Sequence, residues 1–464
     1  MRLGVKHENQ FQIVHADFSG GLNTSVNVDG IADNQLARAI NLEVDHATGK
    51  LKTVAGTIDL LKFENLFAAM YDEISRKLLL VNKDKKIFAF DLETNILGEE
   101  LGTLSEDLYP ICTSWEDGLL IASGGKLQYF NEENLITLNS PNANSVCVQA
   151  GRVLVIDANN LYLSGVGDET NWLEDANNDS SAKFLEVGYK DGGELVGMVS
   201  LPNGVLLVKN NRRVYRLNIG FPTWSLVEIS RNTEISGRLS ICEVADLLFV
   251  LGRNEVQNIQ AANIYGNAKP QNISLLIESE IRKVAENSLL RYIPKLNQVW
   301  LLNGESVLVF DLVTQSWFRR EFNSKILDVI SARDEVLIIK PDRVSKLDEN
   351  IFFDSDEELT WTFKGKRHIS HYEYLLKNTL VSFTPLDNDL TSGEISAGKV
   401  KVKLSLNERG SSTRRRLIHD DEQERPTVLA QNRNVYRNKF LDIEGHGSTG
   451  GIIFNSIILD VVEV

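Results

Sequence analysis

The chain contains a unit of apolar and polar positions that recurs seven times. In each copy, four consecutive apolar residues are followed by a polar turn and then by a stretch in which apolar and polar residues alternate. An uninterrupted apolar run is typical of a strand buried on both faces, and alternation is typical of a half-buried strand. The turns are rich in Asn, Gly, Asp and Lys, so each copy predicts a β-hairpin. The seven apolar runs are 78–81, 119–122, 153–156, 205–208, 247–250, 299–302 and 336–339.

The spacing of these hairpins predicts a β-propeller. The copies follow one another about every 43 residues on average, which suits a repeat whose unit is one four-stranded blade. Almost no helical segments lie between the strands, as a parallel α/β fold would require, and the regular period favours a propeller over stacked β-sandwiches. Seven hairpins predict six to eight blades, because a terminal blade is often completed by strands from both ends of the chain.

The regions on either side of the repeat have a different pattern. Residues 1–56 are rich in Asn, Gly and Asp, and we expect an extended N-terminal arm with one short helix, in which Asp33 caps residues 34–40. Residues 57–350 are assigned to the propeller. Residues 351–464 contain further alternating strands and long polar loops, which predict an antiparallel β-sandwich. The predicted fold class is therefore all-β.

Composition and charge indicate a folded, acidic protein. The 464 residues include 49 Lys and Arg against 64 Asp and Glu, which gives a formal net charge of −15. With 24% charged and 42% hydrophobic residues, wholesale disorder is excluded. Apolar runs are only a few residues long, far too short for a membrane span. The acidic balance argues against a protein that coats duplex DNA, but it suits a surface past which DNA moves without being held.

Residues with the potential for chemistry are few and scattered. Cys112, Cys147 and Cys242 are widely separated among apolar residues, so we interpret them as small buried hydrophobic residues. His368 and His371 would lie on opposite faces of a strand, which favours surface residues over a metal site. The sequence has no phosphate-binding glycine loop, no nucleophile elbow and no clustered carboxylates. We therefore expect no metal, no cofactor, no catalytic residues and no enzymatic activity.

Two turn motifs predict structural roles. The segment 164–172 contains the Asp, Thr and Trp of a sialidase-type box, but the spacing differs and the segment occurs once. We expect Asp168 to bond nearby backbone and Trp172 to pack between blades. The segment 311–317 resembles a blade-corner motif of the kelch type.

One basic concentration lies in the C-terminal region. Arg414, Arg415 and Arg416 stand in a polar loop that also contains Asp420 and Asp421. We interpret this segment as a solvated loop of mixed charge. The alternative is a loop that projects to contact a partner subunit or DNA phosphates.

The N-terminal region carries a distinctive motif. It reads Asp-Phe-Ser-Gly-Gly-Leu-Asn-Thr at 17–24, followed by Ile-Ala-Asp-Asn-Gln at 31–35. This pattern resembles the opening of the nozzle or tubular tail proteins of short-tailed bacteriophages. The turn 49–56 keeps the spacing of that family, with Val54 and Ala55 in place of its Arg-Pro. The resemblance marks as an assembly motif the residues Phe18, Gly20, Gly21, Leu22, Asn23, Asp33, Asn34 and Gln35.

The resemblance implies a structural protein of the virion tail. Such nozzles are similar in forming a six-fold ring below the portal and adaptor, which encloses the channel through which the genome leaves. We therefore expect a homohexamer, assembled in the host cytoplasm and located in the virion, that retains and then releases the genome. The arm and the C-terminal domain would form the body of the ring. The expected partners are other copies of the chain, the portal–adaptor (head–tail connector) proteins, tail fibre or spike proteins and, transiently, genomic DNA.

Two other function classes remain open. A propeller scaffold that binds another protein through its top face would explain the repeat, although not the N-terminal motif. A glycan-binding or receptor-binding tail component would need exposed aromatic residues and paired carboxylates near the funnel. Most of the six tryptophans stand in blade-like positions, which favours roles in the core.

Overall fold

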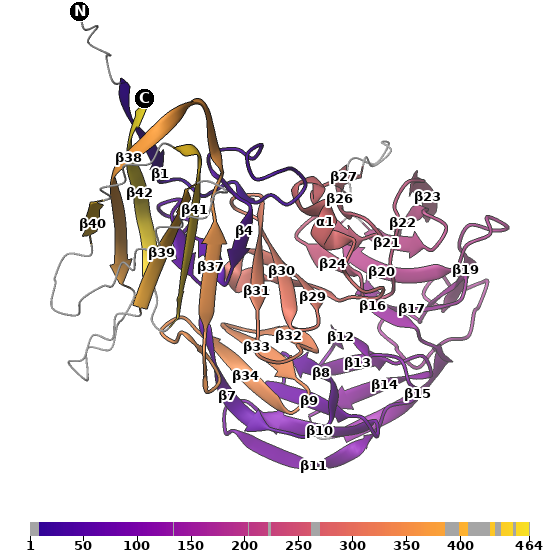
Figure 1. Ribbon diagram of the computed structural model, residues 1–464. Coiled ribbons are helices and arrows are strands. Elements are labelled where there is room, and N and C mark those ends of the chain that lie inside the picture. The colour runs from indigo at the N-terminus through magenta and orange to yellow at the C-terminus, as the bar shows by residue number, and fades with distance from the viewer. Residues whose placement is uncertain are drawn as a thin grey trace, which may run out of the picture.

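Seven four-stranded antiparallel blades account for most of the described chain, arranged around one axis (Figure 1). Five blades are separate sheets, and the other two are parts of larger sheets. The innermost strands β8, β12, β16, β20, β24, β28 and β32 neighbour one another all the way around. The prediction of an all-β propeller with six to eight blades is confirmed. The computed structural model describes residues 9–132, 134–202, 204–220, 224–260, 270–385, 399–406, 427–431, 438–448 and 452–463.

Each blade is an up-and-down sheet that runs from the axis to the rim. Blade 1 consists of β8 (Leu66–Asp72), β9 (Lys77–Asn82), β10 (Lys86–Asp91) and β11 (Ile96–Thr103). Blade 2 consists of β12 (Ile111–Trp115), β13 (Gly118–Ala122), β14 (Lys126–Asn131) and β15 (Asn134–Asn142). Blade 3 consists of β16 (Ser145–Gln149), β17 (Arg152–Asp157), β18 (Asn160–Leu163) and β19 (Lys183–Glu186). Blade 4 consists of β20 (Leu195–Leu201), β21 (Gly204–Lys209), β22 (Val214–Asn218) and β23 (Ser225–Ser230). Blade 5 consists of β24 (Ile241–Val244), β25 (Leu247–Leu251), β26 (Val256–Gln260) and β27 (Gln271–Asn272). Blade 6 consists of β28 (Leu290–Ile293), β29 (Gln298–Asn303), β30 (Ser306–Asp311) and β31 (Ser316–Glu321). Blade 7 consists of β32 (Asp328–Ala332), β33 (Glu335–Lys340), β34 (Arg343–Asp348) and β7 (Gly56–Lys62).

The seven apolar runs of the sequence are the second strands of the seven blades. All five residues of β13 and all six of β21 are buried, because blades cover both faces of these strands. Each second strand pairs with the third strand across the predicted hairpin turn, for example Leu119 with Phe130. The apolar runs therefore mark the middle of each blade, where neighbouring sheets pack on both sides.

The propeller closes with a strand from the N-terminal side. Strand β7 pairs antiparallel with β34, so the seventh blade combines three strands from one end of the repeat with one strand that precedes it. The register places Leu61 opposite Val344 and Gly56 opposite Asp348. This arrangement confirms the expectation that strands from both ends complete a terminal blade.

The C-terminal strands form a two-layered sandwich beside the propeller (Figure 1). The core between the layers contains Trp361, Phe363 and Phe454, with the Phe454 ring centred 5.1 Å from each of the other two rings. The first layer has the order β40 (Thr427–Gln431), β38 (His368–Pro385), β42 (Ile452–Glu463), β1 (Asn9–His15). The second has the order β39 (Lys399–Leu406), β41 (Asn438–Ser448), β37 (Thr360–Lys364), β4 (Arg38–Ile40).

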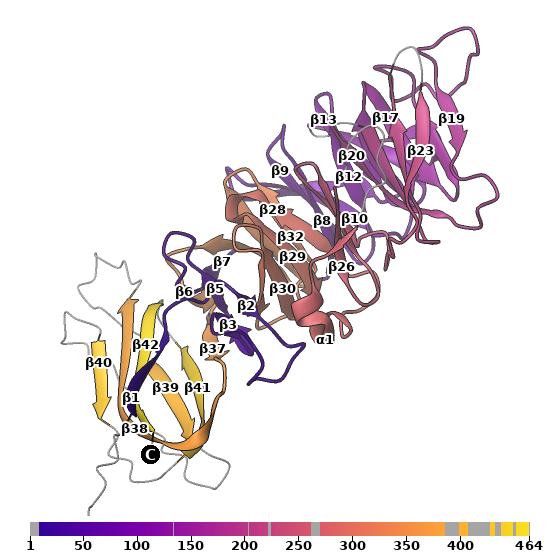
Figure 2. The same cartoon turned by 90° about the horizontal axis from the view of Figure 1, so that it is seen from above.

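The N-terminal region is extended, as predicted, but it lies along the body of the molecule. Figure 2 shows its short strands between the propeller and the C-terminal layers. These strands are β2 (Gly21–Leu22), β3 (Gln35–Leu36), β5 (Leu42–Val44) and β6 (Leu51–Thr53). Two more short strands, β35 (Phe353–Asp354) and β36 (Glu357–Glu358), extend the seventh blade beyond β7.

The helix predicted at residues 34–40 is wrong, because β3 and β4 occupy this segment. Leu36 and Ile40 are buried in strands, where Leu36 pairs with Leu22 of β2 and Ile40 pairs with Thr362 of the distant β37. Asp33 does not cap a helix and instead binds Lys366. The helical turns of the described chain are η1 (Leu275–Ile277), α1 (Glu278–Ile281) and η2 (Pro294–Leu296).

Candidate functional site

The two halves of the N-terminal motif lie against each other. Strand β2 pairs in parallel with β3, which sets Gly21 beside Gln35 and Leu22 beside Leu36. The Gly20 amide donates to the Asn34 carbonyl at 3.1 Å. The eight residues that the resemblance singled out are thus brought together at one place, and we call residues 17–40 the clasp.

Side-chain amides fix the conformation of the clasp. Asn23 Nδ2 donates to Gln35 Oε1 at 2.8 Å, and the same oxygen accepts the Ala32 amide at 3.0 Å. Asn23 Oδ1 accepts the Ser25 amide at 3.2 Å, which forms a short turn after the motif. Because Asn23 is buried, its two hydrogen bonds satisfy side-chain groups that water does not reach.

One face of the clasp contacts the propeller. Gly21 has φ +60°, and a Cβ there would lie 2.7 Å from Ser316 Cβ and 2.8 Å from the Trp317 carbonyl oxygen, so only glycine allows this approach to β31. Leu22 packs in the core of blades 5 and 6 with Trp317. The Thr24 amide donates to the Leu276 carbonyl at 2.8 Å. The clasp is therefore attached to blade 6 and to the helical turns before it.

The other face of the clasp contacts the C-terminal domain. Phe18 is buried in the core of that domain, with its ring centred 6.4 Å from the Phe363 ring. Asp33 Oδ1 accepts a hydrogen bond from Lys366 Nζ at 2.8 Å, and this bond lowers the pKa of the Asp33 carboxyl. The clasp thus holds both parts of the molecule at once.

Strand β4 and Asn41 continue this connection as a sheet. Ile40 lies beside Arg319 of β31 on one edge and Thr362 of β37 on the other, so blade 6 and the second C-terminal layer share one continuous sheet. Asn41 has φ 55° and is buried. Its Nδ2 donates to the Thr360 carbonyl at 2.7 Å, its Oδ1 accepts the Glu321 amide at 2.8 Å, and its own amide donates to the Arg319 carbonyl at 2.9 Å.

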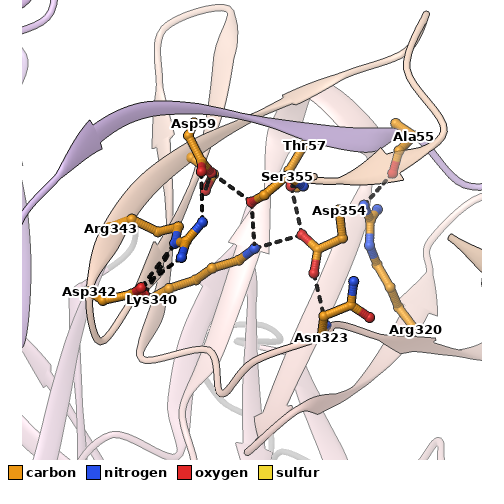
Figure 3. Close-up of polar contacts among 11 residues, drawn as sticks. Ala55, Thr57, Asp59, Arg320, Asn323, Lys340, Asp342, Arg343, Asp354 and Ser355 are labelled. Atoms are coloured by element: carbon orange, nitrogen blue, oxygen red, sulfur yellow. Dashed lines mark hydrogen bonds and ion pairs between the residues drawn. The ribbon is translucent and has the colours of Figure 1, made fainter. Parts of the chain in front are cut away.

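A second polar network locks the closing strand of the propeller (Figure 3). Lys340 Nζ lies 2.6 Å from Asp354 Oδ1, and both side chains are at most 3% exposed. The same carboxylate accepts Thr57 Oγ1 at 2.6 Å and the Asn323 amide at 2.8 Å. Burial alone would raise the pKa of Asp354, but the hydrogen bonds from Lys340, Thr57 and Asn323 outweigh it and lower that pKa.

The same network extends along β7 through Asp59. Its carboxylate binds Arg343 at 2.8 Å and accepts Ser355 Oγ at 2.6 Å. Nearby, Arg320 donates to the Ala55 carbonyl and stacks over the Phe322 ring, 4.8 Å from its centre. Every carboxylate of this network is bonded to a cation, so the arrangement fixes strands and leaves no carboxylate poised to accept a substrate proton.

The axis of the propeller opens into a cavity of about 450 Å³ where the inner strands begin. Arg238 lines it and donates to the carbonyls of Tyr109 and of Asn144, the latter at 2.8 Å. Burial, assisted by nearby Arg291, lowers the pKa of Arg238 to about 10. Deeper in, Asp328 accepts Arg291 Nε at 2.8 Å and the Tyr109 hydroxyl at 2.7 Å. Hydrogen bonds between blades therefore lie beside the cavity and join the inner strands at this end of the propeller.

The turn motifs have the structural roles that the sequence predicted. Asp168 Oδ1 accepts the Thr170 amide at 3.0 Å, and Trp172 packs against the core of blades 2 and 3. Asp311 Oδ1 accepts the amides of Val313 and Thr314 at 3.0 and 2.9 Å. The same Asp-x-x-Ser/Thr turn occurs at 72–75 and 91–94, a recurrence that sequence reasoning missed although the spacing was visible.

The cysteines are buried or half-buried in the described chain, and two of its histidines contact each other. Cys147 is buried, Cys112 and Cys242 are half-buried, and burial raises the pKa of each thiol to about 12. His368 Nε2 lies 2.9 Å from Nε2 of buried His15, a contact that the sequence did not suggest. Among the described residues, no three His, Cys, Asp or Glu side chains gather as a metal site would require. The His371 side chain and the loop with Arg414, Arg415 and Arg416 lie outside the described residues.

Comparisons with known proteins find similarity among solved structures alone. No protein-family model matches the sequence, and no curated protein matches it. Among solved structures, BamB from Moraxella catarrhalis is similar over 64% of this chain and 90% of its own, with 9% identity and a TM-score of 0.41. The Swd1 (Cps50) β-propeller domain from Myceliophteria thermophila is similar over 64% of this chain and 98% of its own, with 9% identity and a TM-score of 0.44. In the part of the chain that the structure describes, no helix is long and apolar enough to cross a membrane.

Proposed function

We propose that the protein is a non-enzymatic structural subunit of a bacteriophage tail. Its copies associate in a ring, of six subunits by resemblance to tail nozzle proteins, below the portal–adaptor complex. The ring encloses the channel through which the genome leaves, retains the DNA in the virion and then guides its ejection. The subunit is made in the host cytoplasm and resides in the virion.

The observation that carries this proposal is the use the chain makes of its N-terminal motif. The motif that resembles the opening of tail nozzle proteins joins the propeller to the C-terminal domain. Phe18 packs in the core of the C-terminal domain, and Leu22 packs in the core of blades 5 and 6. A motif with this role suits a mechanical part whose two modules must keep a fixed orientation. Because its residues are engaged within one chain, we propose that the motif supports assembly indirectly, by positioning the C-terminal domain.

Charge supports the same role. A subunit with a formal net charge of −15 repels a DNA duplex, which carries a dense array of phosphates, so a channel built from such subunits does not hold the passing genome. The further partners in this proposal are the portal–adaptor proteins above the ring and tail fibre or spike proteins at its side. Contact with genomic DNA is transient and independent of sequence.

The test is the mass of the purified full chain, measured alone and mixed with the portal–adaptor complex, with negative-stain images of the same fractions. We expect rings of six copies of the 52.0 kDa chain with an open centre, or rings that form only on the adaptor. A chain that stays monomeric and ignores the adaptor contradicts the proposal.

A second candidate is a propeller scaffold or a glycan-binding or receptor-binding tail component. The feature that favours it is the axial cavity, in which Arg238 could meet an acidic group of a partner. Glycan screening with the full chain and with Arg238→Gln separates the two candidates. Binding that the substitution abolishes, in a chain that forms no rings, supports the second.

A further inference from the structure

The first layer of the C-terminal domain has two open edges. Its order is β40, β38, β42 and β1, and within the described residues no strand pairs with the outer edge of β1 or with the outer edge of β40. An open edge presents a row of backbone donors and acceptors that another strand can bind.

Neither open edge carries the features that usually protect an edge strand. Strand β1 reads Asn-Gln-Phe-Gln-Ile-Val-His and β40 reads Thr-Val-Leu-Ala-Gln, so both lack Pro and residues that are charged at neutral pH. Val14 of β1 is 51% exposed. His15 is buried, and burial, with the neighbouring His368, lowers its pKa to about 4, so its ring is neutral at pH 7.

The other open edge strands of at least four residues in the described part of the chain are protected. The outer strands of blades 1 to 4 carry acidic residues, lysine, proline or register shifts, and such features discourage pairing with a further strand. These residues are Glu99 and Glu100 in β11, Pro141 in β15, Lys183 and Glu186 in β19, and Glu228 in β23. Strand β39, at the edge of the second C-terminal layer, carries Lys399, Lys401 and Lys403. Among the described edge strands of at least four residues, the lack of protection is therefore confined to the two edges of one layer, and the unprotected outer strand of blade 5, β27, is only two residues long.

We propose that these two edges bind each other in successive copies of the chain, so that β1 of one copy pairs with β40 of the next. The inference deepens the proposed function, on which it rests, by naming the surface that forms the ring. Copies with a net charge of −15 repel one another over most of their surface, and contact between these two uncharged edges brings no like charges together.

The strand directions fit a closed ring. Strand β38 is antiparallel to β40 and to β42, and β42 is antiparallel to β1, so β40 and β1 run in opposite directions. Rotation about an axis along the strands preserves their direction, and β40 of the next copy therefore runs antiparallel to β1. The new pair continues the antiparallel pattern of the layer, as a heterologous interface that closes on itself requires.

The same geometry gives the ring a wall of suitable size. Six copies of a four-stranded layer make a barrel of about 24 strands, and at about 4.8 Å per strand its circumference is about 115 Å. The corresponding diameter at the backbone is at least about 37 Å, because the tilt of strands in a closed barrel widens it, and this is wider than a DNA double helix. The first C-terminal layer would thus line the channel, with the propeller outside it.

Cysteine cross-linking of the full chain tests the proposed edge. Val14→Cys is combined with a single cysteine at each position of β40 in turn, from Thr427 to Gln431. Within one copy, β1 and β40 are separated by two strands, or about 14 Å, so no intramolecular disulfide forms. We expect at least one combination to give a ladder of covalent oligomers that ends at the size of the ring, because facing residues of neighbouring strands have Cβ atoms about 5 Å apart.

Two controls make the result specific. Val14→Cys alone reports on the three native cysteines. Val14→Cys with Ile136→Cys, whose native side chain is 50% exposed on β15, places the second thiol on a protected propeller edge and should give no ladder. Without any cysteine, Val14→Lys should raise the concentration needed for assembly at least about tenfold, and Ile136→Lys should not.

The outcomes separate this inference from the proposed function. Rings that form normally in Val14→Lys, and that give no ladder with any β40 cysteine, overturn the edge pairing and leave the tail-ring proposal standing. A wild-type chain that stays monomeric alone and with the portal–adaptor complex overturns both.

Discussion

The propeller is closed by strand pairing within the chain, whereas the first layer of the C-terminal domain ends in two edge strands that no described strand covers. The propeller closes on itself, because β7 completes the seventh blade and Lys340 and Asp354 lock the closure. The first C-terminal layer ends in β1 and β40, two strands without charge or proline. A closed, internally paired module provides rigidity, and in the pairing that we propose the open layer provides the surface that another copy of the chain binds. The clasp joins the two, so that a ring built from the open layers would carry the propellers in a fixed orientation.

The largest expected effect is loss of the propeller closure. Asp354→Ala leaves Lys340 buried without its counter-charge, and we expect the free energy of unfolding to fall by about 3–5 kcal/mol. Chemical denaturation of the full chain measures it. The matched control is Glu93→Ala, which removes an exposed ion pair with Arg76 and should cost no more than about 1 kcal/mol. Equal losses for the two variants would show that the buried pair does not hold the closure.

Next comes the junction at Asn41. Asn41→Ala removes the hydrogen bonds to Thr360 and Glu321 and places alanine at φ 55°, for an expected loss of about 2–4 kcal/mol. Asn65→Ala is the control, since Asn65 has φ 59° in an exposed position and tests the backbone strain alone. Hydrogen exchange should show β4 and β37 opening in Asn41→Ala while the inner blade strands stay protected. Exchange that rises uniformly over the chain would argue against a local junction.

A smaller effect is expected at Gly21. Gly21→Ala places a Cβ against Ser316 and the Trp317 carbonyl, whereas Gly192→Ala, at φ +79°, meets no atom within 4 Å. In both variants alanine at a positive φ should lower the free energy of unfolding by about 1 kcal/mol. In Gly21→Ala the close contact should lower it by roughly a further 1–2 kcal/mol. Thermal unfolding of the two variants gives the comparison. Identical melting temperatures would mean that β31 shifts to accommodate the Cβ of Gly21→Ala with no loss of stability.

The smallest effect concerns pH and separates the two regions. The pKa of His15 falls from its ordinary value to about 4 in the folded chain, through burial and His368, although Asp33 opposes the shift and Lys366 adds to it. The unfolded chain therefore binds a proton that the folded chain does not, and stability decreases as pH falls from about 6.5 towards 4. Between pH 7 and pH 5 the loss is about 2 kcal/mol.

The propeller should resist this range of pH. The pKa of Asp354 and that of Asp191 are lowered in the folded chain, where hydrogen bonds outweigh burial, so their contribution is present above about pH 4 and is lost only below it. Hydrogen exchange at pH 5 and pH 7, corrected for intrinsic rates, should show β1 loosening and the blades unchanged. His15→Gln removes one titrating ring and should reduce the difference to the part that His368 contributes, because burial also lowers the pKa of His368. A difference as large as that of the wild-type chain would place its origin elsewhere.

The repeating part of the fold could be predicted from local pattern, and the junction could not. Each second blade strand is an apolar run that a hairpin turn follows within a few residues, so its signal is contained in a short window. In such a window residues 34–40 fit a helix equally well. They form strands because this segment pairs with β31 and β37, which lie about 280 and 320 residues away in sequence.

The candidate site shows the same division. Resemblance drew attention to the clasp residues, but the partners of Gly21 are Ser316 and Trp317, which no local pattern connects to it. The buried pair of Lys340 and Asp354 also escaped prediction, because a lysine and an aspartate near polar turns look solvent-exposed in sequence. Asn41 carried a detectable sign, since asparagine is among the few residues that adopt a positive φ readily.

The measurement that tests the central claim most directly is hydrogen exchange of the full chain above and below its assembly concentration. The claim is that the propeller is complete within one chain and that the first C-terminal layer is completed by another copy. We predict that amides of β1 and β40 become protected on assembly, while those of the outer propeller strands β11 and β15 exchange at the same rate in both states. Protection that appears on the propeller rim, with β1 and β40 unchanged, would contradict the account.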